Sequence, residues 1–258
     1  MELVPAVRSL LKRGGFNLTK WGSNTREVLA SIPEDDQAPS MQNRDLSDKL
    51  PFERALGMQW NMEEDMFMYK INPKNKPKTR RGILSVTSSL YDPLGLVAPV
   101  TITPKIIQQY LCRLEKLGWD DAVPDDIGER WDRWLAQLPL LMQLNVARCF
   151  KPQGLLEEFT VELHHFCDAS EMAYGAASYV KVYDANGTTR VSLVMGKARV
   201  APIQPLTIPR LELSSAVTAV RLHEIITAEP TIGPTVHQCR LAQRHPSLAF
   251  PGDTNPAE

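Results

Sequence analysis

Two carboxylates in the C-terminal half of this 258-residue chain, Asp168 and Glu212, could form part of a divalent-metal site. Asp168 follows residues 159–167, where apolar and polar side chains alternate with the period of two typical of a half-buried strand. Glu212 falls in the first turn of a helix predicted for residues 210–227. Carboxylate oxygens suit Mg²⁺ and Mn²⁺, and such ions can activate water for phosphodiester hydrolysis. Taken alone, Asp168 is equally compatible with a turn-forming residue at a strand end.

The elements that must position these acids follow from the pattern of residues 155–258. After the Asp168 strand, residues 173–183 are rich in Ala, Tyr and Val, and Asp184–Gly187 predicts a hairpin turn before a return strand at 190–195. The helix at 210–227 comes next. Beyond Ala228 the periodicity stops and prolines punctuate the tail, so no further element is predicted.

The preceding residues 79–150 have helical patterns. Pro104 is expected in the first turn of a helix whose apolar stripe runs over 106–117. A third helix follows Asp125 and carries Trp131 and Trp134 on one face, which favours a role in the core over base stacking.

The N-terminal third is predicted to be mixed. Residues 55–72 contain two short strands around an acidic turn, Glu63–Asp65. Upstream we expect a helix that ends at Gly14, strand-like alternation over 16–20, a short helix over 25–32 and a loop over 33–50.

A basic run without acids separates the strands from the helical region. It could neutralise phosphates, or it could be a solvated linker. Its members are Lys70, Lys74, Lys76, Lys78, Arg80 and Arg81.

The composition excludes several classes of protein but does not identify a function. The formal net charge of -1 gives no global argument for a polyanionic partner. The four cysteines form no CxxC pair, which argues against a zinc knuckle or a disulfide framework. His164 and His165 lie close to Cys167 and could suggest a metal site. Their side chains point to opposite faces of a strand, which argues against a shared ion and favours a structural role. There is no signal peptide pattern and no apolar run long enough for a bilayer, so we expect a cytoplasmic or nuclear protein without a membrane partner.

Seven stretches, in this order, resemble the Pol polyprotein of BEL/Pao long-terminal-repeat retrotransposons, in the region also called Pao retrotransposon peptidase. The resemblance runs from about residue 8 to residue 222. The stretches are Gly14–Trp21 (GGFNLTKW), Leu56–Trp60 (LGMQW), Arg81–Ser85 (RGILS), Tyr91–Pro99 (YDPLGLVAP), Phe166–Ser170 (FCDAS), Lys197–Pro202 (KARVAP) and Ile208–Leu213 (IPRLEL).

This resemblance implies an α/β (α+β) chain in three parts. Residues 1–72 would end a reverse-transcriptase palm, 73–150 would form a helical thumb or connection, and 155–258 a truncated ribonuclease H-like domain with an irregular tail. Asp168 and Glu212 would be its first two metal-binding carboxylates, and Glu258, in a tail similar to the family's Asn-Pro-Ala-Asp motif, its last catalytic acid. Mg²⁺ or Mn²⁺ would be the cofactor of any surviving activity, and an RNA/DNA hybrid or another nucleic acid the partner.

Three departures from the family pattern limit these expectations. No Tyr-x-Asp-Asp turn is present, and Met1 comes after its expected place, so the chain should not polymerise DNA. Between Thr227 and Glu258 there is no Thr-Asp-Ser triplet, which indicates an internal deletion of that strand and its flanking helix. Asp253 begins Asp-Thr-Asn rather than the Asp-Thr-Gly or Asp-Ser-Gly of an aspartic peptidase.

Three hypotheses remain open from the sequence. The first is a catalytically inactive Pol fragment that lacks the third ribonuclease H acid. The second is a residual ribonuclease H that uses Glu258 or Asp253 as the third ligand. The third is a nucleic-acid-binding module without chemistry, centred on the basic run. Loss of a strand would also expose a sheet edge through which copies of the chain could associate.

Overall fold

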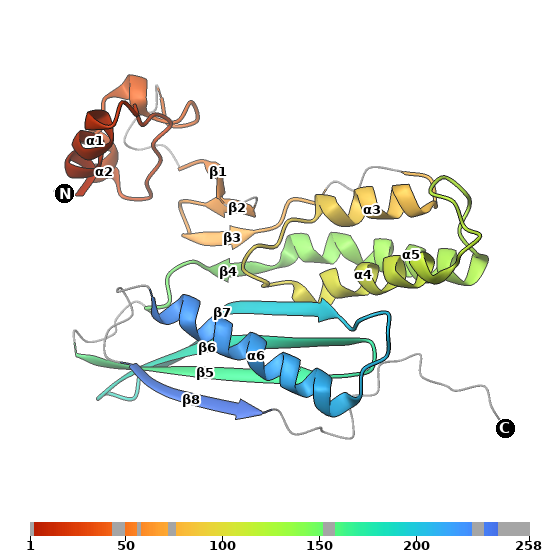
Figure 1. The fold of residues 1–258 in the computed structure, drawn as a ribbon. Helices are drawn as coiled ribbons and strands as arrows, with labels where there is room; N and C mark the ends of the chain where they lie inside the picture. Colours follow the sequence, from red (N-terminus) through yellow and green to blue (C-terminus); the bar gives the residue numbers. More distant parts are fainter. Residues whose placement is uncertain are drawn as a thin grey trace. The chain divides into compact units, whose positions relative to one another are not determined.

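The computed structural model describes residues 3–42, 50–55, 58–71, 76–151, 158–228 and 235–241. The chain divides into two compact units (Figure 1). Unit 1 comprises Met1–Pro93 and Lys116–Phe150, and unit 2 comprises Leu94–Glu115 and Lys151–Glu258. Mixed helices and sheets confirm the predicted α/β class. No helix in the described part of the chain is long and apolar enough to cross a membrane.

Unit 1 contains a small antiparallel sheet in the order β1-β2-β3-β4, together with several helices. Its strands are β1 (Phe52–Ala55), β2 (Met58–Asn61), β3 (Met66–Met68) and β4 (Asn145–Ala147). Its helices are α1 (Leu3–Arg13), α2 (Arg26–Ala30), α3 (Arg80–Ser89) and α5 (Asp125–Gln137), with 3₁₀ turns η1 (Glu34–Asp36) and η2 (Leu138–Gln143).

Most predictions for unit 1 are confirmed, with two corrections. The strands around the acidic turn form β2 and β3, and Trp131 and Trp134 are buried and stacked 4.8 Å apart on one face of α5. The strand expected over 16–20 is wrong, because Trp21 forms only an isolated bridge with Gln37. The loop predicted over 33–50 contributes to the core, where Ala38 and Met41 pack in one buried cluster with Met62.

Unit 2 is built on one sheet in the order β7-β6-β5-β8. Its strands are β5 (Phe159–Ala169), β6 (Ala173–Asp184), β7 (Thr189–Val200) and β8 (Thr235–Leu241). The first three pair antiparallel, whereas β8 runs parallel to β5. Helix α6 (Ile208–Thr227) packs across β5 and β6, and α4 (Ala98–Arg113) packs on β7 (Figure 1). The predicted hairpin turn at Asp184–Gly187 is confirmed.

The core of unit 2 follows from the alternation in β5. Its burial pattern is strictly alternate from Val161 to Ala169, with Leu163 fully buried. These side chains meet the buried face of α6, where Cys167 and Ala176 cluster with Ala219 and Leu222. Each large apolar side chain buried in this way contributes roughly 1.5–3 kcal/mol. The intervening residues of β5, among them Asp168, therefore point to the opposite face of the sheet.

Strand β8 corrects the expectation that no element follows Ala228, whereas the internal deletion stays a prediction. It runs parallel to β5, with a register from Val161 beside Thr235 to Cys167 beside Leu241. The seven residues of β8 (TVHQCRL) include no acid and no Thr-Asp-Ser triplet. Local patterning could not reveal β8, because its partner β5 is more than 60 residues away.

Two further boundaries differ from the prediction. Helix α4 begins at Ala98 with Pro99 in its first turn, so Pro104 lies inside the helix and is buried. Strand β7 is longer than the predicted 190–195, because it pairs with β6 along nearly its whole length. Strands β7 and β8 end the sheet on its two sides, and self-association through such an edge stays a prediction.

Candidate functional site

Asp168 is the penultimate residue of β5, and its side chain is exposed. It pairs across the sheet with Gly175 of β6. Since Cys167 and Ala169 on either side are buried, both neighbours fix the strand and turn Asp168 away from α6. The sheet therefore presents this carboxylate from rigid backbone, as a ligand for a metal requires.

Glu212 lies in the second turn of α6, because the helix begins at Ile208 rather than at the predicted Arg210. Thr207 precedes the helix and Pro209 occupies its first turn, where the missing N–H costs no helical hydrogen bond. Glu212 is exposed, whereas its neighbour Leu211 is fully buried. The packing of Leu211 therefore sets where the Glu212 carboxylate emerges.

Two contacts bring the acids to the same end of unit 2. Ser215, one turn after Glu212, donates a hydrogen bond of 2.8 Å to the carbonyl oxygen of Gly175, the residue paired with Asp168. Leu211 also packs in one buried cluster with Ala169, the residue after Asp168. The helix turn that carries Glu212 is thus held against the strand end that carries Asp168.

The two acids fit a divalent cation in chemistry but do not make a full set of ligands. Neither carboxylate takes part in a hydrogen bond or salt bridge with another of the described residues. Hard oxygen donors match Mg²⁺ and Mn²⁺. The described part of the chain contains no group of three His, Cys, Asp or Glu side chains placed to hold a metal. Glu258, the predicted last acid, lies outside the described residues.

Strand β8 runs past the same end of β5 without adding an acid. Arg240 pairs with Phe166 and Leu241 with Cys167, the residue before Asp168.

The basic run lies in unit 1 and is partly engaged by its own chain. Lys78 forms a salt bridge with Asp132, and Arg81 contacts Asp120 through two hydrogen bonds of 2.7 and 3.0 Å. Arg81 holds the pKa of the Asp120 carboxyl below its usual value, mainly through these hydrogen bonds.

Arg80, the next member of the run, is also held in place. It donates to the carbonyl oxygen of Leu117, and its guanidinium lies 4.6 Å from the ring centre of Trp119. Lys70 and Lys76 are exposed, and Lys74 lies outside the described residues. Phosphate binding by these six residues stays a prediction.

A polar network occupies the face of β5 that also carries Asp168. The Glu162 carboxylate contacts His164 at 3.0 Å, Tyr183 at 3.0 Å and Lys181 at 3.3 Å. Hydrogen bonds from His164 and then Tyr183 lower the pKa of Glu162, and Lys181 adds to the effect.

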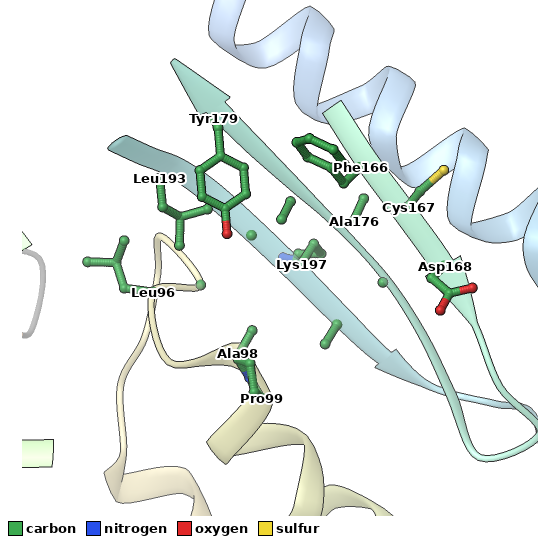
Figure 2. Close-up of a pocket in the computed structure, with 15 residues that line it drawn as sticks. Leu96, Ala98, Pro99, Phe166, Cys167, Asp168, Ala176, Tyr179, Leu193 and Lys197 are labelled. Atoms are coloured by element: carbon green, nitrogen blue, oxygen red, sulfur yellow. The ribbon is translucent and has the colours of Figure 1, made fainter. Parts of the chain in front are cut away.

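Between this network and Asp168 lies a groove of about 420 Å³ that sequence reasoning did not identify. Figure 2 shows Phe166, Tyr179 and Leu193 on neighbouring strands, with Ala98 and Pro99 at the start of α4. The rings of Phe166 and Tyr179 meet edge to face with centroids 5.8 Å apart. Alternation in β5 and β6 places these rings on one face, but the wall from the α4 segment could not be predicted.

That wall is fixed by two glycines. Gly196 of β7 donates a backbone hydrogen bond of 2.8 Å to the carbonyl oxygen of Leu94. A Cβ on Gly95 would lie 1.9 Å from the carbonyl oxygen of Gly196, and Gly95 has a φ of +71°. Only glycine at this position allows the segment before α4 to lie against β7.

A match to a family model agrees with the ribonuclease H-like expectation for unit 2. Residues 79–241, more than half of the chain, match a family model described as the Pao retrotransposon-like RNaseH-like domain. A comparison with curated proteins found no match.

Two solved structures of a foamy viral protease-reverse transcriptase with double-stranded DNA are remotely similar. One, of the dRH form, has 12% identity and a TM-score of 0.38, and the match covers 73% of this chain and 30% of that chain. The other has 12% identity and a TM-score of 0.17, with 74% and 35% covered. The chain therefore spans about a third of these proteins, and similarity this remote carries no argument about activity.

The family match confirms the resemblance seen in the sequence, and the chain belongs to the Pao retrotransposon family, with a ribonuclease H-like domain as its matched part.

Proposed function

We propose that Asp168 and Glu212 together bind one divalent cation, Mg²⁺ or Mn²⁺, at the end of β5, which the Asp168 carboxylate approaches from the face of the sheet opposite α6 and the Glu212 carboxylate from α6. Unit 2 would use this ion to engage the sugar-phosphate backbone of an RNA/DNA hybrid. The observation that carries this proposal is the hydrogen bond from Ser215 to Gly175, which holds the Glu212 turn beside the Asp168 strand end. Membership of a ribonuclease H-like family supports the choice of substrate.

The cation would neutralise phosphate charge and lower the pKa of bound water, which is what hydrolysis requires. The protein's own contribution is to hold two carboxylates on a strand and a helix. A two-acid set leaves most of the coordination to water and substrate, so we expect weak metal binding. For the same reason we expect cleavage by residues 1–258 to be slow or undetectable, as for an inactive Pol fragment.

Metal titration tests the site directly. The intact chain should bind Mn²⁺, followed by the paramagnetic resonance signal of the free ion. Asp168→Asn and Glu212→Gln should each weaken binding by at least about tenfold, since loss even of residues that orient ligands costs 10–100-fold. Glu224→Gln is the matched control, because Glu224 is an exposed acid on the same helix. Equal affinity in all four proteins would contradict the proposal.

Hybrid cleavage separates the remaining alternatives. A labelled RNA/DNA hybrid incubated with Mg²⁺ or Mn²⁺ should stay intact while it binds the protein. Robust cleavage that Asp168→Asn abolishes would instead establish a residual ribonuclease H, with a third ligand such as Glu258 or Asp253. In that case Glu258→Gln or Asp253→Asn should remove the activity.

A binding module that works through the basic run is the second candidate. The exposure of Lys70 and Lys76 favours it. Hybrid affinity would then fall steeply with salt and survive Asp168→Asn. Charge reversal at Lys70 and Lys76 would weaken it.

A further inference from the structure

The groove beside Phe166 shares Asp168 with the proposed metal site, and its other lining residues have no part in that site. We propose that it binds a single unpaired nucleobase of an RNA strand whose phosphate lies at Asp168. The inference rests on the proposed function, because the occupant is chosen by the phosphate chemistry expected at Asp168.

The floor of the groove is flat because its residues are small. Ala177 of β6 pairs with Phe166, and Gly175 pairs with Asp168. On β7, Gly196 and Ala198 pair with these same two residues of β6. Two neighbouring strands therefore present almost bare backbone beside an aromatic ring and a carboxylate, where a planar ring can lie close to the sheet.

The walls provide a surface for stacking. Phe166 is 37% exposed, so one side of its ring is open, and Tyr179 supports it from the edge. The segment before α4 closes the opposite side, held there by the Gly95 contact with Gly196 (Figure 2). Aromatic side chains bind bases by stacking because every base has a π-face.

The size and the position of the groove favour one base over a larger occupant. Its volume of about 420 Å³ lies near the lower end of the roughly 300–1,000 Å³ of small-ligand sites. Phe166 and Asp168 lie two residues apart on the same face, which is about 6.6–6.8 Å along the strand. That separation suits a nucleotide whose base stacks on Phe166 while its phosphate approaches Asp168.

The test uses the full chain and short single-stranded RNAs that carry 2-aminopurine at one position, with Ca²⁺ present. Stacking quenches the fluorescence of this base. We expect saturable quenching by the wild-type protein. Phe166→Ala should reduce the affinity by about 5- to 150-fold, the range that corresponds to loss of one base–aromatic stack.

A second variant and a matched control complete the design. Ala177→Leu should also abolish quenching, because it fills the floor and leaves Phe166 in place. Phe159→Ala should bind like the wild type, since Phe159 is an equally exposed phenylalanine (38%) on the same strand and does not line the groove. Near-ultraviolet circular dichroism checks that each variant is folded.

The proposal is overturned by the absence of quenching in the wild type, by wild-type behaviour of both groove variants, or by equal loss in Phe159→Ala. It is also overturned if an apolar peptide displaces the dye 1-anilinonaphthalene-8-sulfonate from the groove while the RNA does not. Its failure is distinguishable from that of the metal site. Quenching without Mn²⁺ binding would reject only the metal proposal, and Mn²⁺ binding without quenching would reject only the groove.

Discussion

Ser215 and Gly175 are joined by a hydrogen bond of 2.8 Å, from the serine hydroxyl to the glycine carbonyl oxygen. Ser215 is fully buried and follows Glu212 by three residues, and Gly175 is the strand partner of Asp168. This hydrogen bond therefore fixes the position of α6, which carries Glu212, relative to the end of β5, which carries Asp168.

Ser215→Ala should weaken the attachment of α6 to the sheet. We expect a loss of about 1 kcal/mol in the free energy of unfolding, measured with urea, because the buried carbonyl loses its donor. The Mn²⁺ affinity should fall as well. Ser214→Ala is the control, because Ser214 donates only within its own helix, to Arg210, and the change should stay within about 0.5 kcal/mol. Unchanged stability and metal affinity in Ser215→Ala would show that the contact does not position the site.

Gly95→Ala should destabilise unit 2 more than the same substitution at a glycine that has a positive φ but no close neighbour. The added Cβ would collide with the carbonyl oxygen of Gly196 and would also sit at a φ of +71°. Gly187→Ala separates the two effects, since Gly187 has a φ of +82° with nothing within 4 Å of the added atom. Strain alone should cost about 1–2 kcal/mol. Thermal unfolding should therefore show a larger loss for Gly95→Ala, and equal losses would refute the close approach.

A buried chain of polar groups ties α6 to the sheet. His165, which is 3% exposed, contacts Ser178 through Nδ1 at 2.8 Å and His223 through Nε2 at 3.0 Å. Ser178→Ala removes one of these partners and should lower the free energy of unfolding by about 1–3 kcal/mol. Ser192→Ala, on the neighbouring strand β7, should have little effect. A neutral Ser178→Ala variant would show that water replaces the hydroxyl at no cost.

Glu162 should make stability depend on pH in the acid range. Its pKa is lowered from the ordinary value of 4.5, so folding favours the charged form. The stabilisation is fully present above pH 4.5 and is lost as the pH falls through the lowered pKa of the folded state. Urea midpoints measured between neutral pH and pH 3 should fall less steeply for Glu162→Gln than for the wild type. Glu171→Gln, at an exposed turn residue, should leave the slope unchanged.

Local patterns in the sequence were sufficient for much of unit 2. Alternation predicted β5, the content of Ala, Tyr and Val predicted β6, and the turn at Asp184–Gly187 predicted the hairpin partner β7. Pro209 marked the start of α6 to within two residues. These signals are short-range, because each depends on a period of two or on residues at one helix end. They were enough to place Asp168 and Glu212 on the correct kinds of element.

Long-range pairing could not be predicted in the same way. Strand β8 is defined by its register with β5, for example Leu241 beside Cys167, and its own residues have little periodicity. The groove depends on Gly95 meeting Gly196, about 100 residues later, and no local signal marks such an approach. The engagement of Arg81 by Asp120 was equally invisible in a run that contains no acid.

The central claim is that Asp168 and Glu212 bind the same ion, and a double-mutant cycle of Mn²⁺ affinity tests it most directly. The affinities of the wild type, Asp168→Asn, Glu212→Gln and the double variant would be measured by isothermal titration calorimetry. If the acids share one ion, the double variant should bind no more weakly than the worse single variant, a clear departure from additivity. Fully additive losses, or no loss in either single variant, would contradict a shared site.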